Sequence, residues 1–396
     1  MEQPNGPIPV DEIAGMRPLT PPGSPTPARA RTPPGARTPP GARGGEHATN
    51  RGADPGVVGP FLAAALDEPA WRDCEVGLIA GGRSNLTYRV SSAAGDAVLR
   101  RPPLGHVLPT AHDMIREHRV QSALAATTVP VPRMLALCTD SSVLGAPFYV
   151  MSEVAGAVVR TSFPPGYAED PDSRRAISDA LVDVLGDLHA VDPAAVGLGD
   201  FGRPDGFMAR QVRRWTTQWA ATRSVTPPEA GVLMDRLGDR LSTVVPTSGP
   251  TAVLHGDYRL DNTVLDPDRP GRIAAVLDWE MSTLGDPLAD LGLLLVYWMQ
   301  ADDPPELRQR LSLPTVTHLP GFASRAEVVA RYATRSGRDV TSLPWYVAFG
   351  YFKLAGVCAG IAARVAAGAM VGEGFDGWEA MVAPLAATGL ETLDDG

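Results

Sequence analysis

The feature that most restricts how this chain can fold is the polar run 255–262, HGDYRLDN, followed by Asp278. Short apolar segments surround the run. They predict one strand before it and a two-stranded hairpin after it, at residues 252–254, 263–266 and 272–277. Because a hairpin returns the chain to its starting point, Asp278 should lie next to Asn262. The sequence thus predicts that an acid (Asp257), an amide (Asn262) and a second acid (Asp278) surround one point.

These three side chains are the types that phosphoryl transfer requires. One carboxylate (Asp257) orients or accepts the proton of the attacking hydroxyl. An amide oxygen (Asn262) and a further carboxylate (Asp278) can hold the magnesium ion that neutralises the phosphates. The spacing Asp-x-x-x-x-Asn matches the protein kinase catalytic loop, although Gly256 stands where those enzymes have arginine. The simpler alternative is an acidic surface loop with a structural aspartate.

The string HGDYRLDN…VLDWEMSTLGDPLADL resembles the aminoglycoside phosphotransferase and choline kinase-like superfamily over about residues 60–385. It is most similar to the branch that includes kinase-like domains fused to acyl-CoA dehydrogenases. The resemblance implies an α+β class, bilobal protein kinase-like fold, with a small antiparallel β-sheet N-terminal lobe and a mostly helical C-terminal lobe. It also implies binding of ATP, or of GTP, together with Mg²⁺.

Composition argues against several other classes of protein. The chain has 35 Lys plus Arg against 45 Asp plus Glu, a net charge of −10, so we expect no nucleic-acid partner. No apolar run approaches the roughly 18 or more residues of a membrane span, so we expect no membrane partner. The scattered cysteines Cys74, Cys138 and Cys358 predict buried thiols in a reducing cytoplasm rather than a disulfide or zinc site. The oligomeric state stays open.

Residues 1–56 form a separate segment rich in Pro, Gly, Ala, Arg and Thr, in which 31–36 is repeated as 37–42. Such a segment buries too little apolar surface to offset its chain entropy, so we expect a disordered tail. Its arginines permit a docking arm for an acidic or proline-recognising partner. An unstructured tail, or a segment upstream of the true start, is the simpler interpretation.

Two lobes follow the tail. The N-terminal nucleotide-binding lobe, 57–152, is predicted from alternating apolar patterns, with helices at 57–66 and 112–125 and strands at 76–80, 86–90, 97–100, 134–138 and 148–151. The C-terminal lobe, 153–396, should bind the acceptor and be mostly helical. Its predicted helices are 174–190, 207–223, 228–241, one that Asp286 caps with Pro287 at its first position, 325–337, 343–367 and 378–390.

Two groups of N-lobe residues are expected to hold the nucleotide phosphates. The glycine-rich turn at 81–85 should bring Gly82, Ser84 and Asn85 close to them, although an ordinary hairpin turn gives the same pattern. Arg100 ends the third strand, where the family has a phosphate-binding lysine or arginine, and Glu117 is its expected ion-pair partner. Arg101 should point to the opposite face, since side chains alternate along a strand. The alternative for Arg100 and Glu117 is a pair of surface charges.

The remaining candidates lie between the lobes and in the catalytic segment. The segment between the lobes should hold adenine through the backbone of Ser152 and Val154. His255 is expected to support the loop by hydrogen bonds, with a general-base role as the lesser alternative. Arg259 and Glu280 are candidates for substrate or loop support.

The expected reaction is transfer of the γ-phosphoryl group of ATP to a hydroxyl of a small molecule, and the branch favours a hydroxy acid or hydroxyacyl-CoA. An aminoglycoside or other antibiotic kinase is a second possibility. A nucleotide-binding pseudokinase that acts as an interaction module is a third, although the presence of Asp257, Asn262 and Asp278 argues against it. A protein kinase is disfavoured because Gly256 replaces the loop arginine and no Asp-Phe-Gly or Ala-Pro-Glu motif occurs.

Overall fold

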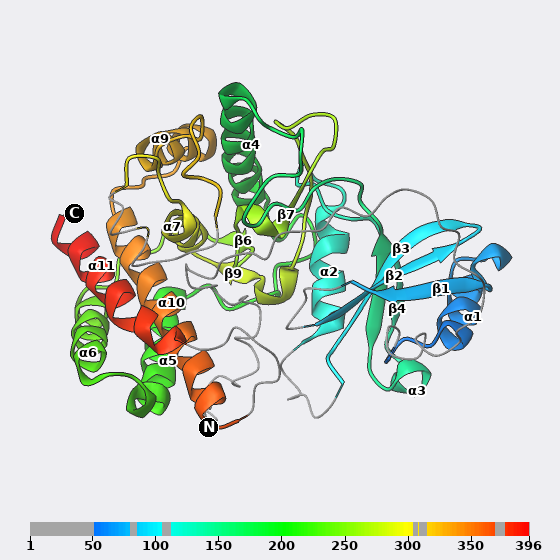
Figure 1. Cartoon of the computed structure of the whole chain (residues 1–396), viewed down its shortest axis with the longest axis horizontal. Helices are drawn as coiled ribbons and strands as arrows, with labels where there is room; N and C mark the ends of the chain where they lie inside the picture. The colour runs from blue at the N-terminus through cyan, green and yellow to red at the C-terminus, as the bar shows by residue number, and fades with distance from the viewer. Residues whose placement is uncertain are drawn as a thin grey trace, which may run out of the picture.

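The computed structural model describes residues 51–79, 85–104, 112–303, 308, 315–368 and 377–395. It has two lobes, which confirms the predicted α+β, kinase-like fold (Figure 1). A five-stranded sheet forms the centre of the N-lobe, and helices make up most of the C-lobe. The predicted glycine-turn residues Gly82 and Ser84, and the tail up to residue 50, lie outside the described residues.

The N-lobe sheet is antiparallel throughout, in the order β1-β2-β3-β5-β4. Its strands are β1 (Cys74–Leu78), β2 (Leu86–Ser92), β3 (Gly95–Arg101), β4 (Met134–Cys138) and β5 (Phe148–Ser152). Helix α1 (Pro55–Ala65) packs on one face and α2 (Met114–Leu124) on the other. Along β3, Leu99 packs with α1 residues and Val98 with Met114 of α2. The alternation therefore places Arg100 on the α2 face and Arg101 on the α1 face.

The C-lobe is built around one large apolar core. Its helices are α4 (Pro171–Ala190), α5 (Phe207–Thr222), α6 (Pro228–Thr243), α7 (Leu288–Tyr297), α9 (Arg325–Ser336), α10 (Leu343–Ala366) and α11 (Val382–Asp395). Helix α10 lies at the centre and packs against α5, α6, α7 and α11. Short 3₁₀ turns lie between these elements, at Pro69–Trp71, Arg223–Val225, Leu260–Asn262, Trp279–Met281 and Trp378–Met381.

Two small ladders carry the site segment at the N-lobe side of these helices (Figure 1). Strand β6 (Ala252–Leu254) pairs with β9 (Thr283–Gly285), and β7 (Thr263–Leu265) pairs with β8 (Ile273–Val276), both antiparallel. The hairpin predicted after the polar run is thus confirmed, and both strands of each ladder begin or end close to a polar candidate residue.

Strand β9 was not predicted, and several helix boundaries differ from the predictions. Helix α1 begins at Pro55, inside the predicted tail, because the Asp54 side chain caps it by accepting from Gly56 N–H at 2.8 Å. The short helix α3 (Ser141–Leu144) was not predicted. Helix α7 begins at Leu288, one residue later than predicted, although Asp286 Oδ1 still accepts from Leu288 N–H at 3.0 Å.

Helix α10 is long and apolar enough to cross a membrane by length and composition alone. However, 83% of its most apolar window is buried inside the protein. Its central place among four other helices explains this composition, because a helix covered on all sides is apolar all round.

Candidate active site

The loop after β6 is held by side chains from two C-lobe helices. Asp290 of α7 accepts hydrogen bonds from the backbone N–H groups of His255, at 2.7 Å, and Gly256, at 2.9 Å. Lys353 of α10 donates to the Gly256 carbonyl at 3.0 Å. Gly256 has φ +85°, a left-handed conformation that suits glycine. The backbone that carries Asp257 is therefore fixed from both sides.

His255 is completely buried and its two ring nitrogens are both occupied. Nε2 lies 2.8 Å from the Leu277 carbonyl, and because a carbonyl only accepts, Nε2 must carry the proton. Nδ1 then accepts from the backbone N–H of Asp257 at 3.2 Å. With neither nitrogen free, His255 can orient the loop but has no lone pair to offer as a general base.

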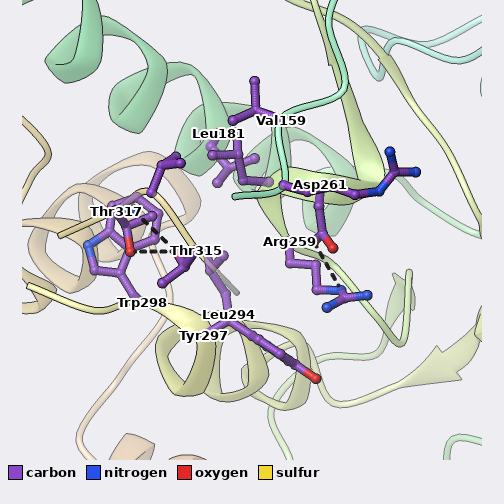
Figure 2. Close-up of a pocket in the computed structure, with 12 residues that line it drawn as sticks. Val159, Leu181, Arg259, Asp261, Leu294, Tyr297, Trp298, Thr315 and Thr317 are labelled. Carbon is purple, nitrogen blue, oxygen red and sulfur yellow. Dashed lines mark hydrogen bonds and ion pairs between the residues drawn. The ribbon is translucent and has the colours of Figure 1, made fainter. Parts of the chain in front are cut away.

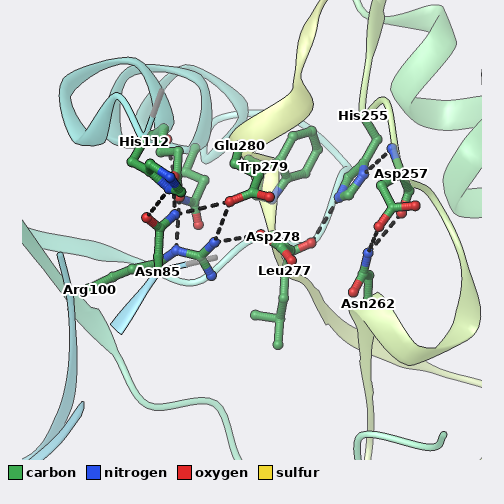
Figure 3. A network of polar contacts seen from close by, with 12 residues as sticks. Asn85, Arg100, His112, His255, Asp257, Asn262, Leu277, Asp278, Trp279 and Glu280 are labelled. Atoms are coloured by element: carbon green, nitrogen blue, oxygen red, sulfur yellow. Dashed lines mark hydrogen bonds and ion pairs between the residues drawn. The ribbon is translucent and has the colours of Figure 1, made fainter. Parts of the chain in front are cut away.

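Asp257 and Asn262 are in direct contact. The Asn262 Nδ2 donates to the backbone carbonyl of Asp257 at 2.8 Å and to its Oδ2 at 3.0 Å. These two bonds turn the amide oxygen of Asn262 away from Asp257 (Figure 3). The Asp257 side chain is 30% exposed, so a substrate hydroxyl can reach it.

Asp278 lies beside Asn262 because the β7–β8 ladder continues for one further bond. The Leu277 N–H donates to the Asn262 carbonyl at 2.8 Å. Asp278 itself has φ 66° and ψ 61° and is one of the few non-glycine residues with left-handed backbone among those described. Such strain is concentrated at functional sites in proteins. The structure thus brings Asp257, Asn262 and Asp278 together as the hairpin predicts.

Asp278 also joins the two lobes through Arg100. Arg100 Nη2 lies 2.5 Å from Asp278 Oδ1 and 3.5 Å from Glu280 Oε2, and its Nε lies 3.1 Å from Glu117 Oε2 (Figure 3). The predicted Arg100–Glu117 ion pair is therefore confirmed. Burial alone would raise the pKa of Asp278, but the Arg100 guanidinium holds that pKa below its ordinary value. The opposite balance holds at Glu117, whose pKa is raised by burial despite Arg100.

Asn85 and His112 extend this network. Asn85 Nδ2 donates to Glu117 Oε1 at 3.0 Å and to Glu280 Oε2 at 3.1 Å, and its Oδ1 lies 2.8 Å from His112 Nδ1. Asn85 was predicted as a phosphate-loop residue, but its amide is bonded to carboxylates of both lobes in this structure. His112 was not predicted, because a histidine before a helix carries no distinguishing signal.

One backbone group of the predicted hinge is already bonded, and the hinge prediction otherwise stays a prediction. The backbone N–H of Ser152 donates to the Arg133 carbonyl at 2.8 Å, so it is not available to a nucleotide base. The strand pairing between β4 and β5 extends past Met151 and uses this group. Val154 follows the last residue pairs of the sheet and is half-buried, and its role stays a prediction.

Arg259 contacts the same carboxylate oxygen of Asp257 as Asn262 does. Its Nε is 3.4 Å from Asp257 Oδ2 and 3.2 Å from Asp261 Oδ1, and its guanidinium carbon lies 4.8 Å from the centre of the Tyr297 ring. Burial raises the pKa of Asp261 although Arg259 opposes this. A small pocket opens beside Arg259 and Asp261 (Figure 2). Its other lining residues include Val159, Arg160, Leu181, Tyr297, Trp298, Thr315 and Thr317.

A magnesium ion fits the residues present. In the described part of the chain, no three His, Cys, Asp or Glu side chains form a cluster able to hold a metal alone. Magnesium does not need one, since it usually binds one or two protein groups together with phosphate oxygens and water. Asn262 Oδ1, turned away from Asp257, and the carboxylate of Asp278 supply two oxygens of the preferred kind.

The fold and the site together define a phosphotransferase of the kinase-like class. Residues 75–327 match the phosphotransferase enzyme family. The chain therefore belongs to this family.

Related proteins and structures agree with this assignment. Acyl-CoA dehydrogenase family member 10 of Mus musculus is 37% identical over 285 residues, which are 72% of this chain and 26% of that protein. Member 11 of Rattus norvegicus is 36% identical over 313 residues, 78% of this chain and 39% of that protein. The chain thus spans well under half the length of these curated relatives.

Among solved structures, a protein of Ralstonia eutropha described as an aminoglycoside phosphotransferase has a TM-score of 0.72 and 33% identity, covering 86% of this chain and 98% of its own. Choline kinase of Cryptosporidium parvum has a TM-score of 0.57 at 12% identity, covering 85% of this chain and 96% of its own, and so shows the shared fold only. The predicted family and its branch are confirmed.

Proposed function

We propose that this protein is an ATP- and Mg²⁺-dependent kinase that phosphorylates a hydroxyl of a small molecule, with a hydroxy acid or hydroxyacyl-CoA as its acceptor. The observation that carries the proposal is the contact between Asp257 and Asn262 at 3.0 Å, next to Asp278 across the hairpin. Family membership supports a phosphotransferase, and the relatedness to acyl-CoA dehydrogenase family members favours an acyl-type acceptor.

In this proposal Asp257 orients the acceptor hydroxyl and takes its proton. The hydroxyl oxygen forms a bond to the γ-phosphorus while the bond from that phosphorus to the bridging oxygen breaks, and ADP leaves with the electron pair. Asn262 and Asp278 would hold magnesium, which neutralises phosphate charge when bound. Arg100 offers a permanently charged guanidinium to the phosphates, and His255, Asp290 and Lys353 keep the loop in place.

ATP consumption with a panel of hydroxy acids, hydroxyacyl-CoA compounds and aminoglycosides tests the proposal. We expect Asp257→Ala to lower the rate at least about 100-fold, because a proton-transfer residue is lost. Asp268→Asn is the matched control, since Asp268 is exposed on the neighbouring hairpin turn. Undiminished turnover of the Asp257→Ala variant would overturn the assignment.

The same panel decides between the acceptor classes. An aminoglycoside kinase is the second candidate, because the Ralstonia eutropha structure with 33% identity is described as an aminoglycoside phosphotransferase. Turnover of aminoglycosides in preference to acids would favour it. A nucleotide-binding pseudokinase would bind ATP but phosphorylate no compound of the panel.

A further inference from the structure

Lys353 is the one lysine in a chain that contains 34 arginines. It lies in α10, a helix of 24 residues whose other charged residue is Arg364. Lys353 occupies the place where this otherwise apolar helix meets the Asp257 loop, since its Nζ donates to the Gly256 carbonyl at 3.0 Å. The one ammonium group of the side chains is therefore beside the catalytic aspartate.

The surroundings of Lys353 are unusual for a purely structural residue. Burial lowers the pKa of Lys353, Asp257 and Asp290 oppose this, and the positive charges of Arg214 and Arg259 lower the pKa further. The two carboxylates therefore offset only part of the effect of burial, and the charged form of Lys353 stays disfavoured. A hydrogen bond to the Gly256 carbonyl requires only a neutral donor. An anionic ligand would favour the charged form.

The Lys353 ammonium can donate more hydrogen bonds than the one it makes to Gly256. A lysine ammonium carries three N–H groups, and within the described residues the Gly256 carbonyl is its one hydrogen-bond partner. Lys353 approaches the loop from a C-lobe helix, whereas Arg100 approaches Asp278 from the N-lobe. Lys353 thus contacts the Asp257 loop from the C-lobe, the lobe that is expected to bind the acceptor.

We propose that Lys353 determines acceptor specificity by binding an anionic group of the acceptor, a carboxylate or a phosphate, while its hydroxyl lies at Asp257. This inference rests on the proposed phosphotransferase function and narrows its acceptor to acidic alcohols. A free hydroxy acid brings a carboxylate close to its hydroxyl, whereas a phosphorylated alcohol brings a phosphate. A polycationic acceptor would be repelled.

Steady-state kinetics with pairs of acceptors that share a carbon skeleton, one charged and one uncharged, test the proposal. The carboxylate arm compares 3-hydroxybutyrate with 1,3-butanediol, and the phosphate arm compares glycerol 3-phosphate with glycerol. For Lys353→Met we expect the acceptor KM to rise about 10- to 100-fold for the preferred anion, as for a lost charge-assisted hydrogen bond. Because Lys353 also holds the Asp257 loop through Gly256, kcat should fall for both acceptors alike. The KM of the charged acceptor relative to that of its uncharged partner is therefore the readout. Partial rescue by Lys353→Arg would support charge recognition.

The matched control is Arg213→Met, which removes an exposed cation from the neighbouring helix α5. Equal changes of KM for charged and uncharged acceptors in Lys353→Met would overturn the proposal and leave Lys353 a structural residue.

Amine labelling gives a readout that needs no turnover. Because Lys353 is the one lysine, trinitrobenzenesulfonate can modify its side chain and the N-terminal amine, which serves as an internal control. With MgADP present, we expect one anionic probe, 3-hydroxybutyrate or glycerol 3-phosphate, to slow labelling of Lys353, and its uncharged partner to leave it unchanged. Equal protection by charged and uncharged probes, or none, overturns this inference alone. Absence of phosphoryl transfer from the wild type to any alcohol would overturn the proposed function instead, whatever the labelling pattern.

Discussion

Arg100 and Asp278 stand 178 residues apart in the chain and form a direct ion pair between the lobes, with Nη2 2.5 Å from Oδ1. In the proposed function these same two side chains bind the phosphates and the cation. The pair therefore occupies part of the nucleotide site with its own charges. Phosphate groups must replace Asp278 as the partner of Arg100, so nucleotide binding and the opening of this ion pair are coupled.

We predict that Arg100→Ala weakens MgADP binding about 10- to 100-fold, the range for losing a hydrogen bond to a charged group. The MgADP affinity of Arg100→Lys should lie between those of the wild type and Arg100→Ala. A lysine ammonium cannot reproduce the two-sided contact of the Arg100 guanidinium, which reaches both Glu117 and Asp278. Isothermal titration calorimetry measures both variants. Arg89→Ala is the control, since Arg89 is an exposed residue of the same sheet. Equal affinities in wild type and Arg100→Ala would exclude a phosphate-binding role.

The Gly256 backbone supplies a second prediction. Gly256 has φ +85°, and a Cβ at this position would lie 2.5 Å from the Met281 carbonyl oxygen. Gly337 has φ +65°, but a Cβ there would meet nothing within 4 Å. Gly337→Ala should therefore cost only the conformational penalty of about 1–2 kcal/mol. Gly256→Ala adds a clash with backbone, so it should lower the free energy of unfolding more and reduce turnover as well. Urea unfolding of both variants checks the ranking, and equal losses would contradict it.

Much of this site could be predicted because its geometry is local. Asn262 and Asp278 flank a short hairpin, so the pairing of Thr263 with Val276 brings them together. Strand alternation likewise separates Arg100 from Arg101, whose guanidinium donates to the Leu144 carbonyl at 2.8 Å on the other face.

The rest depends on partners that are distant in sequence. The Asn85 amide is bonded to Glu280, 195 residues later, and no local pattern specifies that contact. The Ser152 N–H is used by β4 because the sheet continues one residue beyond the predicted strand end. Lys353 is the one lysine of the sequence, but its place beside Gly256 follows only from the packing of α10.

The buried pair His189 and Asp290 predicts how stability depends on pH. Burial lowers the pKa of His189 although Asp290 opposes this, and the pKa of Asp290 is lowered by His189 although burial opposes that. In both cases the unfolded chain binds protons more readily than the folded protein. Stability should therefore fall as pH drops below about 6.5, the ordinary histidine value, and fall further below about 3.9.

The His189→Gln variant should lack the loss of stability below about pH 6.5, because it has no histidine at this position. Its free energy of unfolding should change less between pH 7.5 and pH 5 than that of the wild type, by up to about 1.4 kcal/mol per pH unit. Chemical denaturation at several pH values measures the difference. His118→Gln is a useful comparison, because His118 is less buried and its pKa is lowered by burial alone. Parallel pH curves for the wild type and His189→Gln would show that His189 keeps its ordinary pKa in the folded protein.

The last prediction concerns magnesium. Asp278→Asn keeps the shape of the side chain, and asparagine tolerates the left-handed backbone at φ 66° better than most residues, so the fold should survive. The substitution removes the negative charge that a cation needs and also releases Arg100 from its ion pair. We therefore expect the Mg²⁺ concentration for half-maximal rate to rise about tenfold or more, as when a carboxylate ligand becomes neutral.

The affinity for nucleotide without magnesium should not fall in Asp278→Asn, in contrast to the affinity for Mg²⁺. In Asp278→Asn, Arg100 has no ion pair with residue 278 to break before it binds the phosphates. Metal-free ADP should therefore bind Asp278→Asn at least as tightly as it binds the wild type. Asp268→Asn on the hairpin turn should change neither quantity. If Asp278→Asn left the magnesium requirement unchanged, Asp278 would be a partner of Arg100 only, and the metal would have to bind through other groups.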